Sequence, residues 1–64
     1  MPMIWLLIER VEGGFVVTAS DDVGKIVSRS ANLKADAVAR CKAEVEALLE
    51  TECRFESRDL TEGR

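Results

Sequence analysis

The side chains of this sequence that could take part in chemistry are two adjacent aspartates, a run of glutamates, several serines and two cysteines. The 64-residue chain contains no histidine, which is the side chain most often used as a general base and is a frequent zinc ligand. No histidine is therefore present to activate a serine, and Cys41 and Cys53 lie in no motif that favours the thiolate. We expect no enzymatic activity and no cofactor. Both cysteines are expected to be reduced and half-buried, with a single disulfide as the alternative.

Asp21 and Asp22 are adjacent carboxylates, which attract hard cations. Calcium takes roughly six to eight oxygen ligands, and no further acidic residue stands at ligand spacing in this loop. Aspartate shortly before Gly24 is instead typical of a turn, in which its side chain accepts hydrogen bonds from the nearby backbone. We predict a turn here and no metal site.

Four glutamates lie between Lys42 and Arg54 with no basic residue among them: Glu44, Glu46, Glu50 and Glu52. Such a run is either a solvated face or a negative patch that steers the protein onto a basic partner. The formal net charge of -3 argues against direct nucleic-acid binding, because that binding needs cations to displace phosphate counterions. We predict that these glutamates, together with Asp21 and Asp22, contact a basic protein.

Three short strands are expected in the first half of the chain, over residues 3–12, 15–20 and 25–29. Gly13-Gly14 separates the first two strands and favours a type I′ hairpin, because both central positions of that turn need positive φ. The three segments predict an antiparallel meander.

A helix is predicted over residues 33–50, which are rich in good helix formers and contain no glycine or proline. Asn32 is the expected N-cap, with Ser30 as the alternative. A switch to alternating polar and apolar residues then predicts a short edge strand over residues 52–56. Apolar residues at helical spacing form the stripe expected to face the core: Val38, Cys41, Val45 and Leu48, widened by Ala37 and Leu49.

The predicted hairpin carries apolar side chains on both of its faces. If Glu12 pairs with Phe15, one face holds Ile4, Leu6, Ile8, Phe15, Val17 and Ala19, and the other holds Met3, Trp5, Leu7, Val11 and Val16. One helix covers only one face of a sheet, and an uncovered apolar face usually marks an interface. Trp5 is then a candidate binding hot spot, because large aromatic residues dominate interfaces; a core position is the alternative.

The order strand, Gly-Gly, strand, turn, strand, helix, strand resembles that of the HicB-like antitoxin family. Residues 13–18 (Gly-Gly-Phe-Val-Val-Thr) are similar to the family's glycine pair, aromatic residue, two valines and small polar residue. Asp21 and Gly24 fall where its Asp-x-x-Gly turn would place them. Residues 35–39 resemble the acidic, alanine-rich start of its helix.

The resemblance implies a truncated ribonuclease-H-like sheet that blocks a small basic RNA-targeting toxin and catalyses nothing itself. Two positions depart from the family, because Ser20 and Val23 stand where it usually has prolines. No segment resembles the C-terminal DNA-binding domain that many members carry, so the resemblance implies neutralisation without autoregulation.

We therefore expect a single α+β domain over residues 1–58 with a frayed tail over residues 59–64. Its fold would be an antiparallel sheet of three or four strands, in the order strand, strand, strand, helix, strand, with the helix packed on one face. The apolar run at the N-terminus is shorter than the about 20 residues that span a bilayer. It also lacks the basic segment and cleavage site of a signal peptide, so we expect a cytoplasmic location.

The function predicted from the sequence is non-enzymatic. The protein would bind a basic, nucleic-acid-handling protein and inhibit it by masking its functional surface, as a HicB-like antitoxin does. One alternative is a phage-encoded inhibitor of a host defence complex, of the anti-CRISPR kind. The other is a structural homodimer in which apolar sheet faces pair. Neither a nucleic acid nor a membrane is an expected partner.

Overall fold

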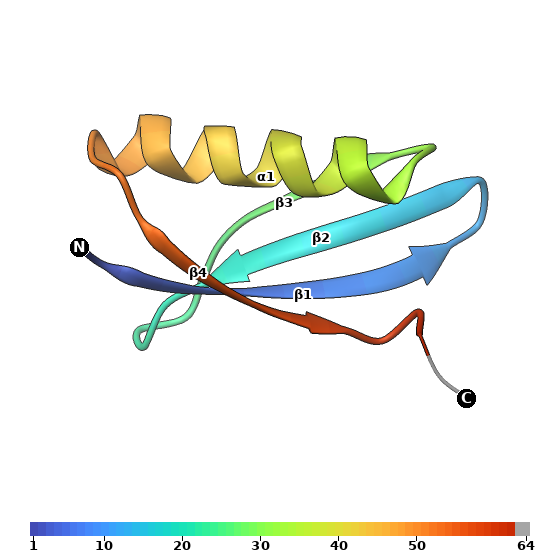
Figure 1. Ribbon diagram of the computed structural model, residues 1–64, viewed down its shortest axis with the longest axis horizontal. Coiled ribbons are helices and arrows are strands. Elements are labelled where there is room, and N and C mark those ends of the chain that lie inside the picture. Colours follow the sequence, from blue (N-terminus) through green and yellow to red (C-terminus); the bar gives the residue numbers. More distant parts are fainter. Residues whose placement is uncertain (63–64) are drawn as a thin grey trace.

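The computed structural model describes residues 1–62 as a sheet with one helix packed on it (Figure 1). Residues 63–64, which belong to the predicted tail, lie outside the described part of the chain. The elements follow the predicted order: β1 (Met3–Val11), β2 (Gly14–Ser20), β3 (Lys25–Ala31), α1 (Lys34–Leu49) and β4 (Arg54–Asp59).

Within residues 1–62 the sheet has four strands in the order β3-β2-β1-β4, and the predicted α+β class with one helix is confirmed there. The pairs β1–β2 and β2–β3 are antiparallel. The prediction of a wholly antiparallel sheet is wrong, because β4 runs parallel to β1. The reason is the helix: its 16 residues span about 24 Å. This length returns the chain from the end of β3 to the end of the sheet where β1 begins, as a parallel pairing requires.

The β1–β2 hairpin is shifted by two residues from the predicted register. Arg10 lies opposite Phe15 and Ile8 opposite Val17. The two faces are nevertheless those predicted, because a shift of two residues preserves the alternation of side chains. The turn residues are Glu12 and Gly13, and only Gly13 has positive φ, at 83°. The predicted type I′ turn is therefore wrong, since that turn needs positive φ at both positions.

Gly14 is needed for a different reason from Gly13. A Cβ atom built on Gly14 would lie 2.3 Å from the carbonyl oxygen of Ala31, so no other residue allows β3 to approach this closely. Gly13 is thus needed for the turn, and Gly14 is needed for the close packing of β2 against β3.

The core lies between α1 and the face of the sheet that it covers. It is formed by Ile4, Leu6, Ile8, Val17, Ala19 and Val27 of the sheet, with Ala37, Cys41, Val45 and Cys53. Buried helix positions recur in steps of four, from Ala37 to Val45. Leu48, predicted to face the core, therefore falls to the side of this row and is 57% exposed.

The ends of α1 differ slightly from the predicted ones. Leu33 is the N-cap, and no side chain hydrogen-bonds to the first turn, so the prediction of Asn32 is wrong. At the other end Glu50 adopts a left-handed conformation, and its N–H donates to the carbonyl oxygen of Glu46. Within residues 1–62, no helix is both long enough and apolar enough to cross a membrane.

Candidate functional site

Two of the predicted partner-binding glutamates on α1 contact other segments of the chain. The Glu44 Oε1 atom lies 3.4 Å from Arg29 Nη2, which joins α1 to β3. Glu46 Oε2 accepts a hydrogen bond of 3.1 Å from the backbone N–H of Cys53, which ties the last turns of α1 to the segment that leads into β4. Both carboxylates therefore have partners within the chain.

Asp21 also has an internal role. Its Oδ1 atom accepts hydrogen bonds from the backbone N–H groups of Val23, at 2.9 Å, and Gly24, at 3.1 Å. The Asp21 N–H donates in turn to the Gly24 carbonyl oxygen at 3.0 Å. This is the side-chain-to-backbone turn that the sequence predicts.

The remaining acidic candidates are exposed at one end of the molecule. Glu50 and Glu52 lie in the turn from α1 to β4, and Asp22 lies in the turn from β2 to β3. Figure 1 shows both turns at the same end of the long axis, on the left. We call Asp21, Asp22, Glu50 and Glu52 the acidic end. No ion pair involves these four residues within residues 1–62.

The C-terminus of α1 adds to the negative potential of the acidic end. The last helical turn contains no basic residue. The final carbonyl groups of a helix carry about half a negative charge, and here no side-chain cation in that turn offsets it. The fold thus places four of the six predicted acidic residues at one end and leaves Glu44 and Glu46 outside the group, on α1.

Trp5 alternates with Ile4 and Leu6 of the core and so lies on the face of the sheet away from α1. No element of residues 1–62 covers this face (Figure 1). Its neighbours Ile4 and Leu6 are buried under α1, while Trp5 is 47% exposed. A hydrogen bond of 2.7 Å between Thr18 Oγ1 and Ser28 Oγ crosses the same face. We call this face, opposite α1, the open face.

The last strand contributes side chains to the open face that the sequence did not point to. Strand β4 begins two residues later than predicted, and its register with β1 places Trp5 beside Glu56 and Leu7 beside Arg58. A hollow of about 560 Å³ lies among these side chains and Ser20. The alternation of charged residues in residues 54–58 was the available signal, but it did not show which strand β4 would join.

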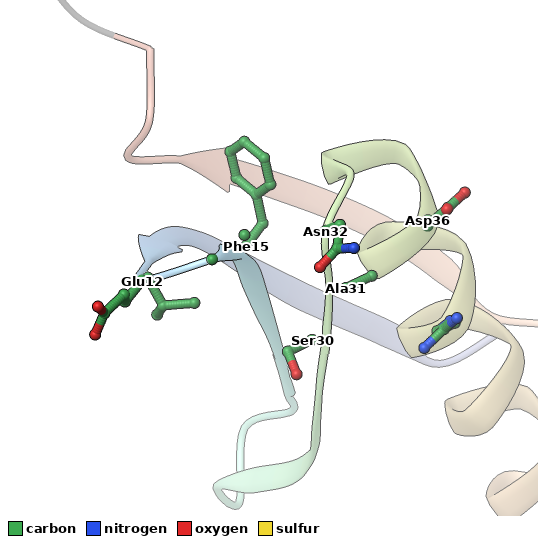
Figure 2. A pocket seen from close by; sticks show the side chains of 10 residues that line it. Glu12, Phe15, Ser30, Ala31, Asn32 and Asp36 are labelled. Carbon is green, nitrogen blue, oxygen red and sulfur yellow. The ribbon is translucent and has the colours of Figure 1, made fainter.

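A second hollow, of about 460 Å³, lies between the hairpin turn, the end of β3 and the first turns of α1 (Figure 2). Glu12, Asn32, Asp36 and Arg40 supply its charged and amide groups. Figure 2 shows the carboxylates of Glu12 and Asp36 pointing away from each other on opposite sides of the hollow. The polar groups do not converge on one point, as they would in a small-molecule site.

An ion-pair cluster that the sequence did not indicate joins β4 to the start of α1. Lys34 Nζ lies 2.8 Å from Asp59 Oδ2 and 3.5 Å from Glu62 Oε2. Asp59 Oδ1 accepts hydrogen bonds from the Thr61 N–H at 2.9 Å and the Thr61 hydroxyl at 2.6 Å. The hydrogen bond from Lys34, aided by those from Thr61, lowers the pKa of Asp59 to about 2. The same bond raises the pKa of Lys34 above its usual value. Lys34 and Asp59 are 25 positions apart in the sequence, so no local spacing pattern indicates their contact.

The two cysteines are free and buried. Burial raises the pKa of the Cys41 thiol, and burial together with the nearby Glu46 carboxylate raises that of Cys53. Both residues therefore stay protonated at neutral pH and pack as small apolar groups. Within residues 1–62, no three potential metal ligands cluster together.

Comparisons with known proteins found no match: no family model, no curated protein and no solved structure resembles the chain closely enough to be reported.

Proposed function

We propose that this protein is a non-enzymatic binding module that inhibits a basic, nucleic-acid-handling protein by covering its functional surface, in the manner of a HicB-like antitoxin. The observation that carries the proposal is the acidic end. Three of its carboxylates, those of Asp22, Glu50 and Glu52, are exposed, and none forms an ion pair within residues 1–62. Glu50 and Glu52 also lie next to the C-terminus of α1, the negative end of its dipole.

The physical basis of the proposal is electrostatic complementarity. Acidic groups that protrude from one end of a small domain raise the association rate with a basic surface and disfavour acidic partners. A surface that normally binds phosphate groups carries such basic charge. Binding of this kind weakens as salt is added, because the charges are solvent-exposed and are screened.

The structure divides the predicted contact residues into two sets. Glu44, Glu46 and Asp21 bind groups of their own chain, so a partner would compete for them. Glu50, Glu52 and Asp22 meet no such competition, and the proposal assigns the partner contacts to these three. The element order that carries the HicB-like resemblance is present in the fold and also supports the proposal.

The test is a pull-down from nuclease-treated host lysate with tagged protein, washed at low and at high salt. We expect capture of a basic nucleic-acid-binding protein that is released at high salt. The variant Glu50→Lys/Glu52→Lys should lose this partner at low salt. The identity of the captured protein then distinguishes a toxin from a component of a host defence complex.

A matched control uses the same charge change at the opposite end of the molecule. Glu12→Lys/Asp36→Lys alters two exposed acids by the same total charge, so it should still capture the partner. If both double variants lose the partner equally, net charge alone governs binding and the acidic end has no special role. If neither loses it, charge-based masking is wrong.

A further inference from the structure

Strand β1 is built to be buried on both of its faces. Residues 3–8 form an unbroken apolar run, Met-Ile-Trp-Leu-Leu-Ile. A strand with one solvated face normally alternates apolar and polar residues, whereas an unbroken run is typical of strands covered on both sides. Helix α1 covers the side that carries Ile4, Leu6 and Ile8. The other side of β1 has no cover within residues 1–62.

The side chains on the open face of β1 form an apolar stripe with an aromatic residue in it. Trp5 is 47% and Val11 is 42% exposed, and Met3 and Leu7 are half-buried. On the next strand Val16, also half-buried, lies beside the stripe. Clusters of this type, with an exposed aromatic anchor among aliphatic residues, form the energetic centre of protein interfaces.

The charged residues along this stripe indicate what covers it. Strands β1 and β4 place two acids and two bases on the open face: Glu9, Glu56, Arg54 and Arg58. None of these four forms an ion pair within residues 1–62. The whole chain has a net charge of -3, so the acidic excess lies elsewhere.

The part of the open face formed by β1 and β4 carries equal numbers of acids and bases, which suits it to a second copy of itself; Lys25, which pairs with Ser20, adds one base at the β3 edge. In an interface between identical copies related by a twofold axis, every contact occurs twice: residue i of the first copy contacts residue j of the second, and residue j of the first contacts residue i of the second. An acid on one copy can then meet a base on the other twice. A strongly basic partner would be repelled by the two arginines, so this face and the acidic end suit different partners.

We propose that the open face binds the open face of a second copy, so that two sheets stack with the α1 helices on the outside. Packed sheets lie about 10 Å apart. A stable interface buries about 800 Å² on each partner, which is close to a fifth of the 4343 Å² that the chain exposes. One face of a two-layer domain can supply this share, and a small domain gains stability from the association. The inference goes beyond the proposed function and does not depend on it.

The first test is sedimentation equilibrium of the full chain. We expect a reversible dimer, and Trp5→Glu should raise its dissociation constant at least tenfold. Leu48→Glu is the matched control, because Leu48 is a 57% exposed apolar residue on α1 and receives the same charge. Far-ultraviolet circular dichroism reports whether each variant is folded. A wild-type chain that stays monomeric at high micromolar concentration overturns the proposal, as does an equal loss of association in the Leu48 variant.

The second test exchanges charges on the open face. It remains informative even if the Trp5→Glu variant of the first test does not fold. Arg54→Glu/Arg58→Glu leaves four acids and no base on the β1 and β4 part of the face, and Glu9→Arg/Glu56→Arg leaves four bases and no acid there. Each variant alone should associate at least tenfold more weakly than the wild type. An equal mixture should form the mixed dimer, which native mass spectrometry identifies by its mass. If the mixture forms no more dimer than either variant alone, a second copy does not cover the open face.

Discussion

The two faces of the sheet are formed by the same strands, but alternate residues of each strand point to opposite faces. On the face under α1, Ile4, Leu6 and Val17 are at most 1% exposed. On the open face Trp5, one residue from Ile4, is 47% exposed. The comparison teaches that apolar content alone does not define the core of a chain this small. Position relative to the single helix decides which apolar residues fold the chain and which remain available for binding.

The largest expected effect separates two adjacent leucines. Leu6→Ala removes a buried side chain, and we expect it to lower the free energy of unfolding by about 2–5 kcal/mol. Leu7→Ala alters a half-buried side chain on the open face and should cost about 1 kcal/mol or less in dilute solution. Urea denaturation of both variants measures the difference. Equal losses at low protein concentration would contradict the distinction between the two faces.

The next effect concerns the glycine that lets β3 approach the hairpin. Gly14→Ala puts a methyl group 2.3 Å from the Ala31 carbonyl oxygen, so the strands must move apart. We expect a loss of about 1–3 kcal/mol, which for a domain of this size lowers the melting temperature by roughly 4–8 °C per kcal/mol.

Gly13→Ala is the control for that prediction. Nothing lies within 4 Å of a Cβ atom on Gly13, and the substitution acts only through its φ of 83°. It should cost about 1–2 kcal/mol. If thermal unfolding shows no loss for Gly14→Ala, the close approach of β3 is not needed for packing.

A smaller effect distinguishes an acid that supports the fold, Glu46, from an exposed acid of the acidic end, Glu52. Glu46→Ala leaves the Cys53 N–H without its acceptor, and we expect a loss of about 1 kcal/mol. Glu52→Ala changes an exposed residue and should stay within about 0.5 kcal/mol of the wild type. Thermal unfolding compares the two. A larger loss for Glu52 would mean that the acidic end is structural.

The smallest effect is a pH dependence at the end of β4. The pKa of Asp59 is lowered from 3.8 to about 2 by its bonds to Lys34 and Thr61. A lowered carboxyl pKa stabilises the folded state above the usual pKa, and this contribution is lost as the pH falls through the lowered value. We expect Asp59→Asn to be less stable than the wild type above about pH 4, and the difference should shrink towards pH 2. Parallel acid-unfolding curves would contradict the Lys34–Asp59 contact.

Local patterns predicted most of the elements and the sorting of β1 side chains into two faces. Ile4 and Leu6 were correctly predicted to lie on the other face of the sheet from Trp5, because an error of two residues in register leaves the alternation of side chains unchanged. The parallel pairing of β4 was not predicted, because the direction of β4 depends on the end of the sheet to which α1 returns the chain. The residues of β4 themselves do not indicate that direction. Leu48 was wrongly predicted to face the core, because steps of three and steps of four from Cys41 and Val45 both fit a helical stripe. The buried positions follow the steps of four, Ala37, Cys41 and Val45.

The candidate contacts were predicted less completely than the fold. Composition identified the acidic residues, but it did not show that Glu44 and Glu46 are engaged by Arg29 and the Cys53 N–H. The contact between Lys34 and Asp59 joins residues 25 positions apart, so it exists only once the sheet has formed. Long-range pairs of this kind follow from topology and not from local spacing.

The most direct test of the two-face account uses the single tryptophan of the chain as its reporter. Trp5 lies on the open face, so its fluorescence should respond to the covering of that face and not to the core. We predict that dilution shifts its emission to longer wavelength while the far-ultraviolet circular dichroism stays constant, since the dimer separates and the chain remains folded. Emission that is unchanged across the dilution series, or that shifts only as the circular dichroism is lost, would contradict the account.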